Sequence, residues 1–214
     1  MQHPDLQTRA PRRRALAWAA PVLCLGFGLS PTACAPDLSG DDAGDDGPPV
    51  VVEDNGDGSS TIIVDGRDDQ DWVYFDLESS MEVSPTDPGD SPAWDLGVLR
   101  FNVKTNGGTS GTGMVGVAVL EGVTFDSVEQ APADGYISDE VNAGPADMEP
   151  EPGYAFDLWY DYDMDSHTLA PRAAIYVVRT VEENYFKIEF LDYYNDAGTA
   201  GYVKFRTAPI AAPG

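Results

Sequence analysis

The segment Trp94–Gly111 constrains the fold of this chain more than any other part of the sequence. Its first part alternates apolar and polar residues, as in a β-strand with one buried face. The chain then runs directly into Asn106–Gly111, where three glycines permit backbone angles that other residues avoid. A strand that ends in such a turn indicates a fold built from strands.

Eight short segments rich in β-branched and aromatic residues are predicted to form strands. They are Thr61–Val64, Trp72–Leu77, Leu96–Lys104, Met114–Leu120, Ala155–Tyr162, Ala173–Arg179, Tyr185–Tyr194 and Tyr202–Arg206. Turn signals such as Asp65-Gly66 and Pro152-Gly153 separate them, and the sole helical signal is a turn near Phe125–Glu129. We therefore expect an all-β fold, with one domain of antiparallel strands and hairpins.

One predicted strand, Ala155–Tyr162, carries large side chains at every second position. Alternation places Phe156, Leu158, Tyr160 and Tyr162 on one face of it. Such a face is either part of the core or the lining of a groove for a flat aromatic ligand.

The N-terminus has the features of an export signal. Four arginines precede an apolar stretch at 15–29, which is too short to span a membrane stably. Thr32 and Ala33 then precede Cys34 as in a lipobox, although Pro31 stands where such boxes usually carry leucine. We expect residues 1–33 to be a lipoprotein signal peptide and Cys34 to be the lipidated first mature residue. The alternative is an ordinary secretory signal that leaves Cys34 as a free thiol.

The mature chain is strongly acidic. Residues 1–33 hold four of the 12 basic and one of the 37 acidic residues, which leaves 8 and 36 and a net charge of −28. Such a charge repels nucleic acid and anionic lipid headgroups, so nucleic-acid binding is excluded and membrane contact is expected through the lipid anchor alone. Residues 34–58 alternate aspartate with glycine, proline and serine, and we expect a disordered tether there, followed by the folded domain at 59–214.

Several blocks together resemble the HmuY-like family of surface lipoproteins, whose founding members bind haem. Besides Trp94–Gly111, the similar segments are Asp71–Phe75, Ala131–Tyr136, Tyr176–Arg179 and Lys187–Tyr194. They follow the order of the family and extend over nearly the whole domain. The resemblance implies an outer-membrane, surface-exposed lipoprotein that takes haem from solution or from a haem-carrying protein, with an outer-membrane transporter as a further partner.

The resemblance also implies where haem would be held, by two axial side chains. The mature chain has one histidine, His167, so a bis-histidine site within one molecule is impossible. The family pattern instead places Met148 and Met164 at the two ligand positions, with Phe156 and Tyr160 against the porphyrin. Methionine sulfur favours ferrous haem. The alternative is that both methionines are packing or surface residues, since acidic residues flank each of them.

Other chemistries find weaker support in the sequence. Asp161, Asp163 and Asp165 form a D-x-D-x-D run that could collect a cation, but the EF-hand glycine and glutamate positions are not matched. No Gly-x-Ser-x-Gly elbow and no P-loop lysine is present. We therefore expect binding without catalysis. The alternative to haem capture is an envelope module that keeps the fold and binds another ligand or a protein partner.

Overall fold

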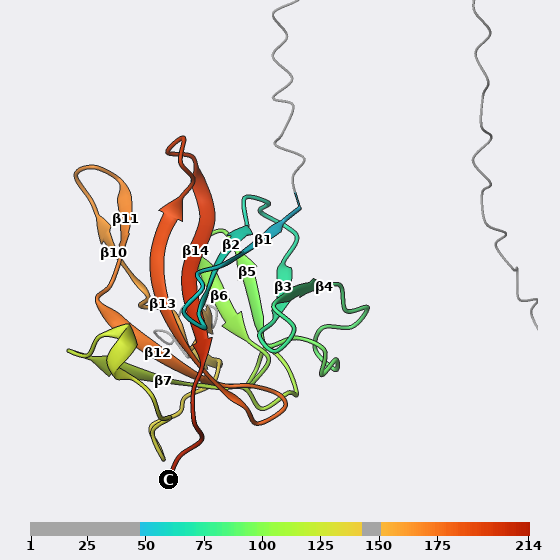
Figure 1. The fold of residues 1–214 in the computed structure, drawn as a ribbon. Helices are drawn as coiled ribbons and strands as arrows, with labels where there is room; N and C mark the ends of the chain where they lie inside the picture. The colour runs from blue at the N-terminus through green and yellow to red at the C-terminus, as the bar shows by residue number, and fades with distance from the viewer. Residues whose placement is uncertain (1–47, 143–150) are drawn as a thin grey trace, which may run out of the picture. The chain divides into compact units, whose positions relative to one another are not determined.

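The computed structural model describes residues 48–142 and 151–214 of the chain, and its largest element is a six-stranded antiparallel sheet (Figure 1). In spatial order its strands are β1 (Val50–Asp54), β2 (Ser60–Asp65), β14 (Ala200–Pro209), β13 (Tyr185–Tyr194), β12 (Ala174–Arg179) and β7 (Gly116–Glu121). A second sheet of four strands is also antiparallel. Its order is β4 (Met81–Val83), β3 (Val73–Asp76), β5 (Leu96–Leu99) and β6 (Asn102–Thr105). The predicted all-β fold is thereby confirmed.

The core lies between these two sheets, because each turns its apolar face toward the other. Phe75 of β3 meets Phe205 of β14 edge to face, with ring centroids 6.2 Å apart. Phe190 of β13 stacks on Trp159, with ring centroids 4.6 Å apart. Burial of each such side chain contributes about 1.5–3 kcal/mol.

The six-stranded sheet is also covered on its outer face, around β12. A short 3₁₀ turn, Phe125–Ser127, and the chain after it pack Phe125 and Val128 against Ile175 and Val177. Because both faces of β12 are covered, five of its six residues are buried. This explains why β12 reads as a continuous apolar run rather than an alternating one.

The glycine-rich turn wraps around the fully buried side chain of Asn106. The Asn106 amide donates to the carbonyl oxygens of Ser91 and Trp94, at 2.8 Å each, and accepts from the Gly113 N–H at 3.1 Å. A Cβ at Gly111 would lie 2.0 Å from Asn106 Oδ1. The turn is therefore glycine-rich because its backbone closes directly onto a buried side chain.

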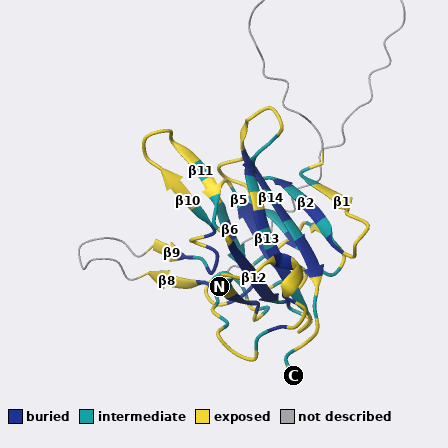
Figure 2. Ribbon diagram, turned by 60° about the vertical axis from the view of Figure 1, so that its left-hand side comes forward, coloured by how far each residue is buried: buried dark blue, intermediate teal, exposed yellow. Residues whose placement is uncertain are grey.

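Two small hairpins project from the same side of the domain (Figure 2). The first pairs β8 (Glu140–Asn142) with β9 (Glu151–Gly153), and the second pairs β10 (Tyr160–Asp163) with β11 (Thr168–Pro171). The second hairpin is mostly exposed along its length. No helix among the described residues is long and apolar enough to cross a bilayer.

The predicted strand Leu96–Lys104 is wrong as a single element. It is a hairpin, because Arg100 adopts a φ of 55° and the chain reverses at Arg100 and Phe101 to pair β5 with β6. The alternating pattern passes through the turn without interruption and so conceals it.

The predicted strand Ala155–Tyr162 is also wrong over most of its length. Residues 155–159 form a turn, and a strand begins only at Tyr160. The turn buries Phe156 and Trp159 completely while Leu158 stays 68% exposed, so the predicted common face of Phe156 and Leu158 does not exist. A spacing of three between buried residues, rather than two, is what the turn requires.

The predicted tether 34–58 needs correction at its C-terminal end. Residues 50–54 form β1, which pairs with β2 from Val50↔Val64 to Asp54↔Ser60. Asp57 closes the intervening turn, because its carboxylate accepts from the Ser59 N–H at 3.0 Å. The short apolar run Val50–Val52 thus belongs to an edge strand of the six-stranded sheet. Residues 34–47, with Cys34, and the predicted signal peptide lie outside the described residues.

We expect the Gly108→Ala variant to lose about 2 kcal/mol or more of unfolding free energy. Gly108 has a φ of +60°, and a Cβ there would lie 1.8 Å from the Asp139 carbonyl oxygen, so the substitution adds an overlap to an unfavourable backbone angle. Urea denaturation followed by tryptophan fluorescence measures the loss.

The matched control for this prediction is Gly135→Ala. Gly135 has a φ of +86°, but a Cβ there meets nothing within 4 Å, so the cost is that of the backbone angle alone, about 1 kcal/mol. Equal losses in the two variants would contradict the packing argument at Gly108.

Candidate functional site

The two projecting hairpins hold the positions that the sequence singled out as haem ligands. Met164 lies in the turn between β10 and β11 and is 73% exposed. Met148 lies in the sequence between β8 and β9, in the segment 143–150, outside the described residues. In the sequence the two methionines thus lie between the paired strands of two different hairpins.

Local hydrogen bonds shape the turn that carries Met164. The backbone N–H groups of Asp165 and Ser166 donate to Asp163 Oδ1, at 2.8 and 3.2 Å, and lower the pKa of Asp163. His167 has a φ of 56°, and its Nδ1 lies 2.7 Å from the hydroxyl of Tyr162. An exposed thioether and an imidazole are therefore presented within one turn.

The structure separates the two aromatic residues that were predicted to contact a ligand. Phe156 is fully buried and packs against Tyr176 and Phe190, with ring centroids 5.4 and 5.7 Å away. It belongs to the core, and its ring offers no surface to a ligand. Tyr160 is half-buried at the start of β10, with its ring 5.7 Å from that of Phe101. The predicted pairing of Phe156 with Tyr160 is therefore corrected.

A largely apolar groove opens where the two hairpins join the sheet. Two adjoining hollows, of about 290 and 280 Å³, share Ile137, Tyr154, Ala155 and Asp157. The larger one, which we call the β12 groove, is also lined by six residues of β7, β12 and the segments beside them. These are Val119, Glu121, Leu158, Arg172, Ala174 and Tyr176. Each hollow is close to the lower end of the size of small-molecule sites, about 300–1,000 Å³.

Arg172 is the one cationic residue that lines the β12 groove. Its backbone is fixed, because its N–H donates to the Trp159 carbonyl oxygen at 2.9 Å. Its guanidinium lies 3.9 Å from Glu121 and 3.7 Å from Asp161, and both carboxylates are largely exposed. Exposed pairs at these distances contribute little, so the guanidinium is only weakly engaged.

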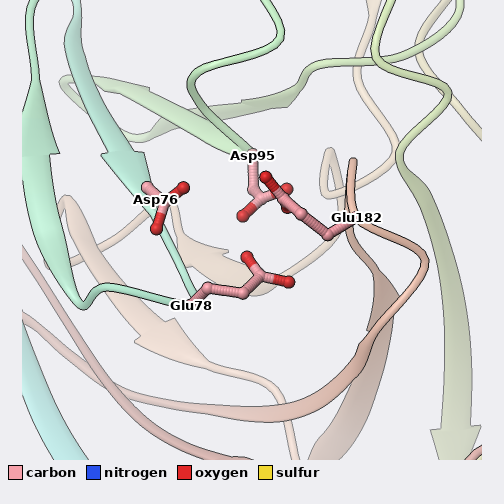
Figure 3. A group of neighbouring side chains, drawn as sticks. All are labelled: Asp76, Glu78, Asp95 and Glu182. Atoms are coloured by element: carbon pink, nitrogen blue, oxygen red, sulfur yellow. The ribbon is translucent and has the colours of Figure 1, made fainter.

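Four carboxylates converge elsewhere, at the end of the sandwich near the β12–β13 turn. Ligand atoms of Asp76, Glu78, Asp95 and Glu182 all lie within 4.8 Å of one another (Figure 3). Among the described residues this is the one such convergence of acidic, histidine or cysteine side chains, so Asp161, Asp163 and Asp165 do not form a second one.

Hydrogen bonds within this cluster tie separate chain segments together. Asp95 is fully buried, and its carboxylate accepts from the N–H groups of Leu77 and Val181, at 2.9 Å each. Glu78 Oε1 accepts from the hydroxyl of Thr180 and from the Asn184 side-chain amide. Through these contacts the cluster connects the second sheet to the β12–β13 turn, which gives it a structural role.

Burial also changes the ionisation of the cluster. It raises the pKa of Asp95 to about 8, and the nearby charge of Glu78 adds to this, while the two N–H donors oppose it. Burial and the Glu78 charge likewise raise the pKa of Glu182. Four carboxylates this close together are stable when at least one holds a proton.

Neither the β12 groove nor the acidic cluster was predicted from the sequence. The groove is assembled from positions 119 to 176, which no local pattern connects. The cluster had one local signal, since Asp95 stands between Trp94 and Leu96, both of which are core residues.

Comparison with known proteins gives consistent results. The model of the HmuY protein family matches residues 68–206. No curated protein sequence matches the chain. Three solved structures share the fold at low sequence identity, and in each the matched region covers nearly all of the other chain.

The first is a candidate lipoprotein from Bacteroides fragilis, with 20% identity, a TM-score of 0.56 and coverage of 74% of this chain and 93% of the other. The second is a candidate HmuY-like heme binding protein from Bacteroides vulgatus, with 19% identity, a TM-score of 0.55 and coverage of 74% and 96%. The third is the apo HmuY analogue of Tannerella forsythia, with 18% identity, a TM-score of 0.54 and coverage of 76% and 97%.

We expect the acidic cluster to make the fold less stable as the pH rises. The pKa of Asp95 is about 8 in the folded state and near 3.8 in the unfolded chain. The protonated carboxyl therefore favours the fold fully below pH 4, and this contribution is lost as the pH rises toward 8. The Glu78→Gln variant removes the charge beside Asp95, so its unfolding free energy should fall less between pH 5 and 8, by about 1 kcal/mol.

Urea denaturation at pH 5, 6, 7 and 8 measures this dependence. The control is Glu82→Gln, which removes one charge from the exposed strand β4 and should leave the pH profile as it is in the parent protein. An unchanged profile in Glu78→Gln would show that the charge of Glu78 does not contribute to the raised pKa of Asp95.

Proposed function

The chain belongs to the HmuY family, and from this premise we propose that it is a haem-binding lipoprotein of the cell envelope. Cys34 would carry the lipid anchor, and the domain would face outward from the outer membrane. Its role would be binding rather than catalysis, with haem, or a protein that carries haem, as the partner and an outer-membrane transporter as the recipient.

The observation that carries the proposal is the hairpin turn that presents Met164. Met164 is 73% exposed at this turn, so its thioether is accessible to a ligand from solution. Methionine sulfur is a known axial ligand of haem iron. Met164 would supply one ligand and Met148, from the connection between β8 and β9, the second.

Two further features of the described residues support an apolar ligand that carries carboxylates, as haem does. The β12 groove provides apolar surface at the base of the β10–β11 hairpin, and its one cation, Arg172, suits a ligand with carboxylates. Bound haem would supply an iron centre, which two thioethers would favour in the ferrous state. The acidic neighbours Asp163 and Asp165 oppose an anionic ligand at the turn itself, which makes the charge of Arg172 more important.

We expect the full chain to bind haemin with a saturable change in the Soret spectrum, and to give a low-spin ferrous spectrum after reduction with dithionite. The Met164→Ala and Met148→Ala variants should each lose the low-spin ferrous spectrum and at least about tenfold in affinity. In metal sites, removing a residue that only hydrogen-bonds to a metal ligand already lowers the metal affinity or activity about 10–100-fold.

The matched control is Met114→Ala, because Met114 is equally exposed but precedes β7, outside both hairpins. It should bind haemin as the parent chain does. If no saturable change occurs in either redox state, the proposal fails, and the chain is an envelope module of the same fold with another ligand or a protein partner. If both methionine variants still bind haemin, haem binding stands but the methionines are not the ligands. The next variant to test would then be one at His167.

A further inference from the structure

We propose that Arg172 recognises a carboxylate of the ligand and that the β12 groove holds the apolar body next to that carboxylate. This inference rests on the proposed function and adds to it a selectivity for free acids over esters. It concerns the described residues alone and does not depend on Met148.

The lining of the groove has the composition expected for an amphipathic ligand. Three apolar side chains at its rim are strongly exposed, namely Leu158 at 68%, Ile137 at 54% and Val119 at 43%. They lie together beside Ala155 and Ala174, which are buried. Apolar side chains that gather at a hollow mark a binding site far more often than scattered ones do.

The charge around the groove leaves one place for an anion. Glu121 and Asp157 also line it, and burial raises the pKa of Asp157, so Arg172 is the one lining residue whose charge attracts an anion. A ligand carboxylate would have to displace Glu121 and Asp161 from the guanidinium. The whole chain carries a net charge of −25, so an anionic ligand gains nothing from long-range attraction. A single guanidinium therefore decides whether a carboxylate is accepted.

The contacts of Arg172 are suited to an exchange of partners. Its Nη1 lies 3.4 Å from the Leu158 carbonyl oxygen, and its pairs with Glu121 and Asp161 are longer than a direct hydrogen bond. A guanidinium has five donors and binds a carboxylate through two of them at once. A ligand carboxylate can thus replace these weak pairs without breaking the backbone hydrogen bond that holds Arg172.

The position of Arg172 separates this contact from the proposed iron ligand. Arg172 directly follows Pro171, the last residue of β11, whereas Met164 lies at the other end of the same hairpin. Arg172, at the base of the hairpin, would bind the carboxylate, and Met164, in the turn, would bind the iron. A ligand would then be recognised at two independent points.

The test compares haemin with its dimethyl ester, which has the same ring and iron but no free carboxylate. The full chain and its Arg172→Gln variant are titrated with both by tryptophan fluorescence quenching. We expect the parent chain to bind haemin about fivefold more tightly than the ester, the upper end of what an exposed ion pair contributes. Arg172→Gln should bind both equally, with its affinity for the ester unchanged.

The matched control is Arg179→Gln, because Arg179 lies at the far end of β12, outside the groove. It should keep the preference for the free acid. The inference is overturned if the parent chain binds acid and ester equally, or if Arg172→Gln retains the preference. A merely structural role of Arg172 would weaken both ligands together and is excluded by an unchanged affinity for the ester.

A second probe separates this inference from haem binding. Parinaric acid and its methyl ester are fluorescent, apolar and free of iron, and they differ in the carboxylate alone. If haemin does not bind but the parent chain prefers parinaric acid and Arg172→Gln does not, the proposed function fails and the inference stands. If the chain binds neither haemin nor parinaric acid, both are wrong.

Discussion

The buried carboxylate of Asp139 holds together the parts on which the site depends. It accepts from the Thr105 N–H at 2.8 Å, from the Thr105 hydroxyl at 3.0 Å and from the Ala155 N–H at 2.9 Å. These contacts join the end of β6 to the first residue of the turn that lines the β12 groove. Burial raises the pKa of Asp139, and the three donors offset part of that cost. Together with the buried side chains of Phe156 and Trp159, this carboxylate fixes the turn against the sandwich.

The site combines a rigid wall with an exposed hairpin. The wall is formed by β7 and β12, and β12 is buried on both faces, so Ala174 and Tyr176 are fixed by the core. The β10–β11 hairpin has few buried residues, and regions of that kind open locally at low free-energy cost. In the proposed site the wall therefore offers a fixed surface, and the hairpin is the part that changes conformation most easily.

The sequence predicted strands best in the middle of the six-stranded sheet, at β13 and β12. The range Tyr185–Tyr194 is confirmed without change, and β12 differs by one residue. It failed where alternation continues through a turn, at Arg100 and at Phe156, because a period of two carries no information about where the chain reverses. Met164 was singled out through the family resemblance and stays a prediction. Arg172 was not singled out, because the groove that it lines is formed with residues about 50 positions earlier in the sequence, such as Val119 and Glu121.

The position of β1 at the edge of the six-stranded sheet has a mechanical consequence for an anchored chain. If Cys34 carries the proposed lipid anchor, the 15 residues between Cys34 and Val50 limit the distance between them to about 50 Å. A pull along this segment acts first on Val50. Val50 pairs with Val64 at the open end of the β1–β2 hairpin, opposite its turn. The backbone hydrogen bonds between β1 and β2 would then break one after another, starting at Val50. Tension on the proposed anchor would thus separate the edge strand β1 before it reached the core strands.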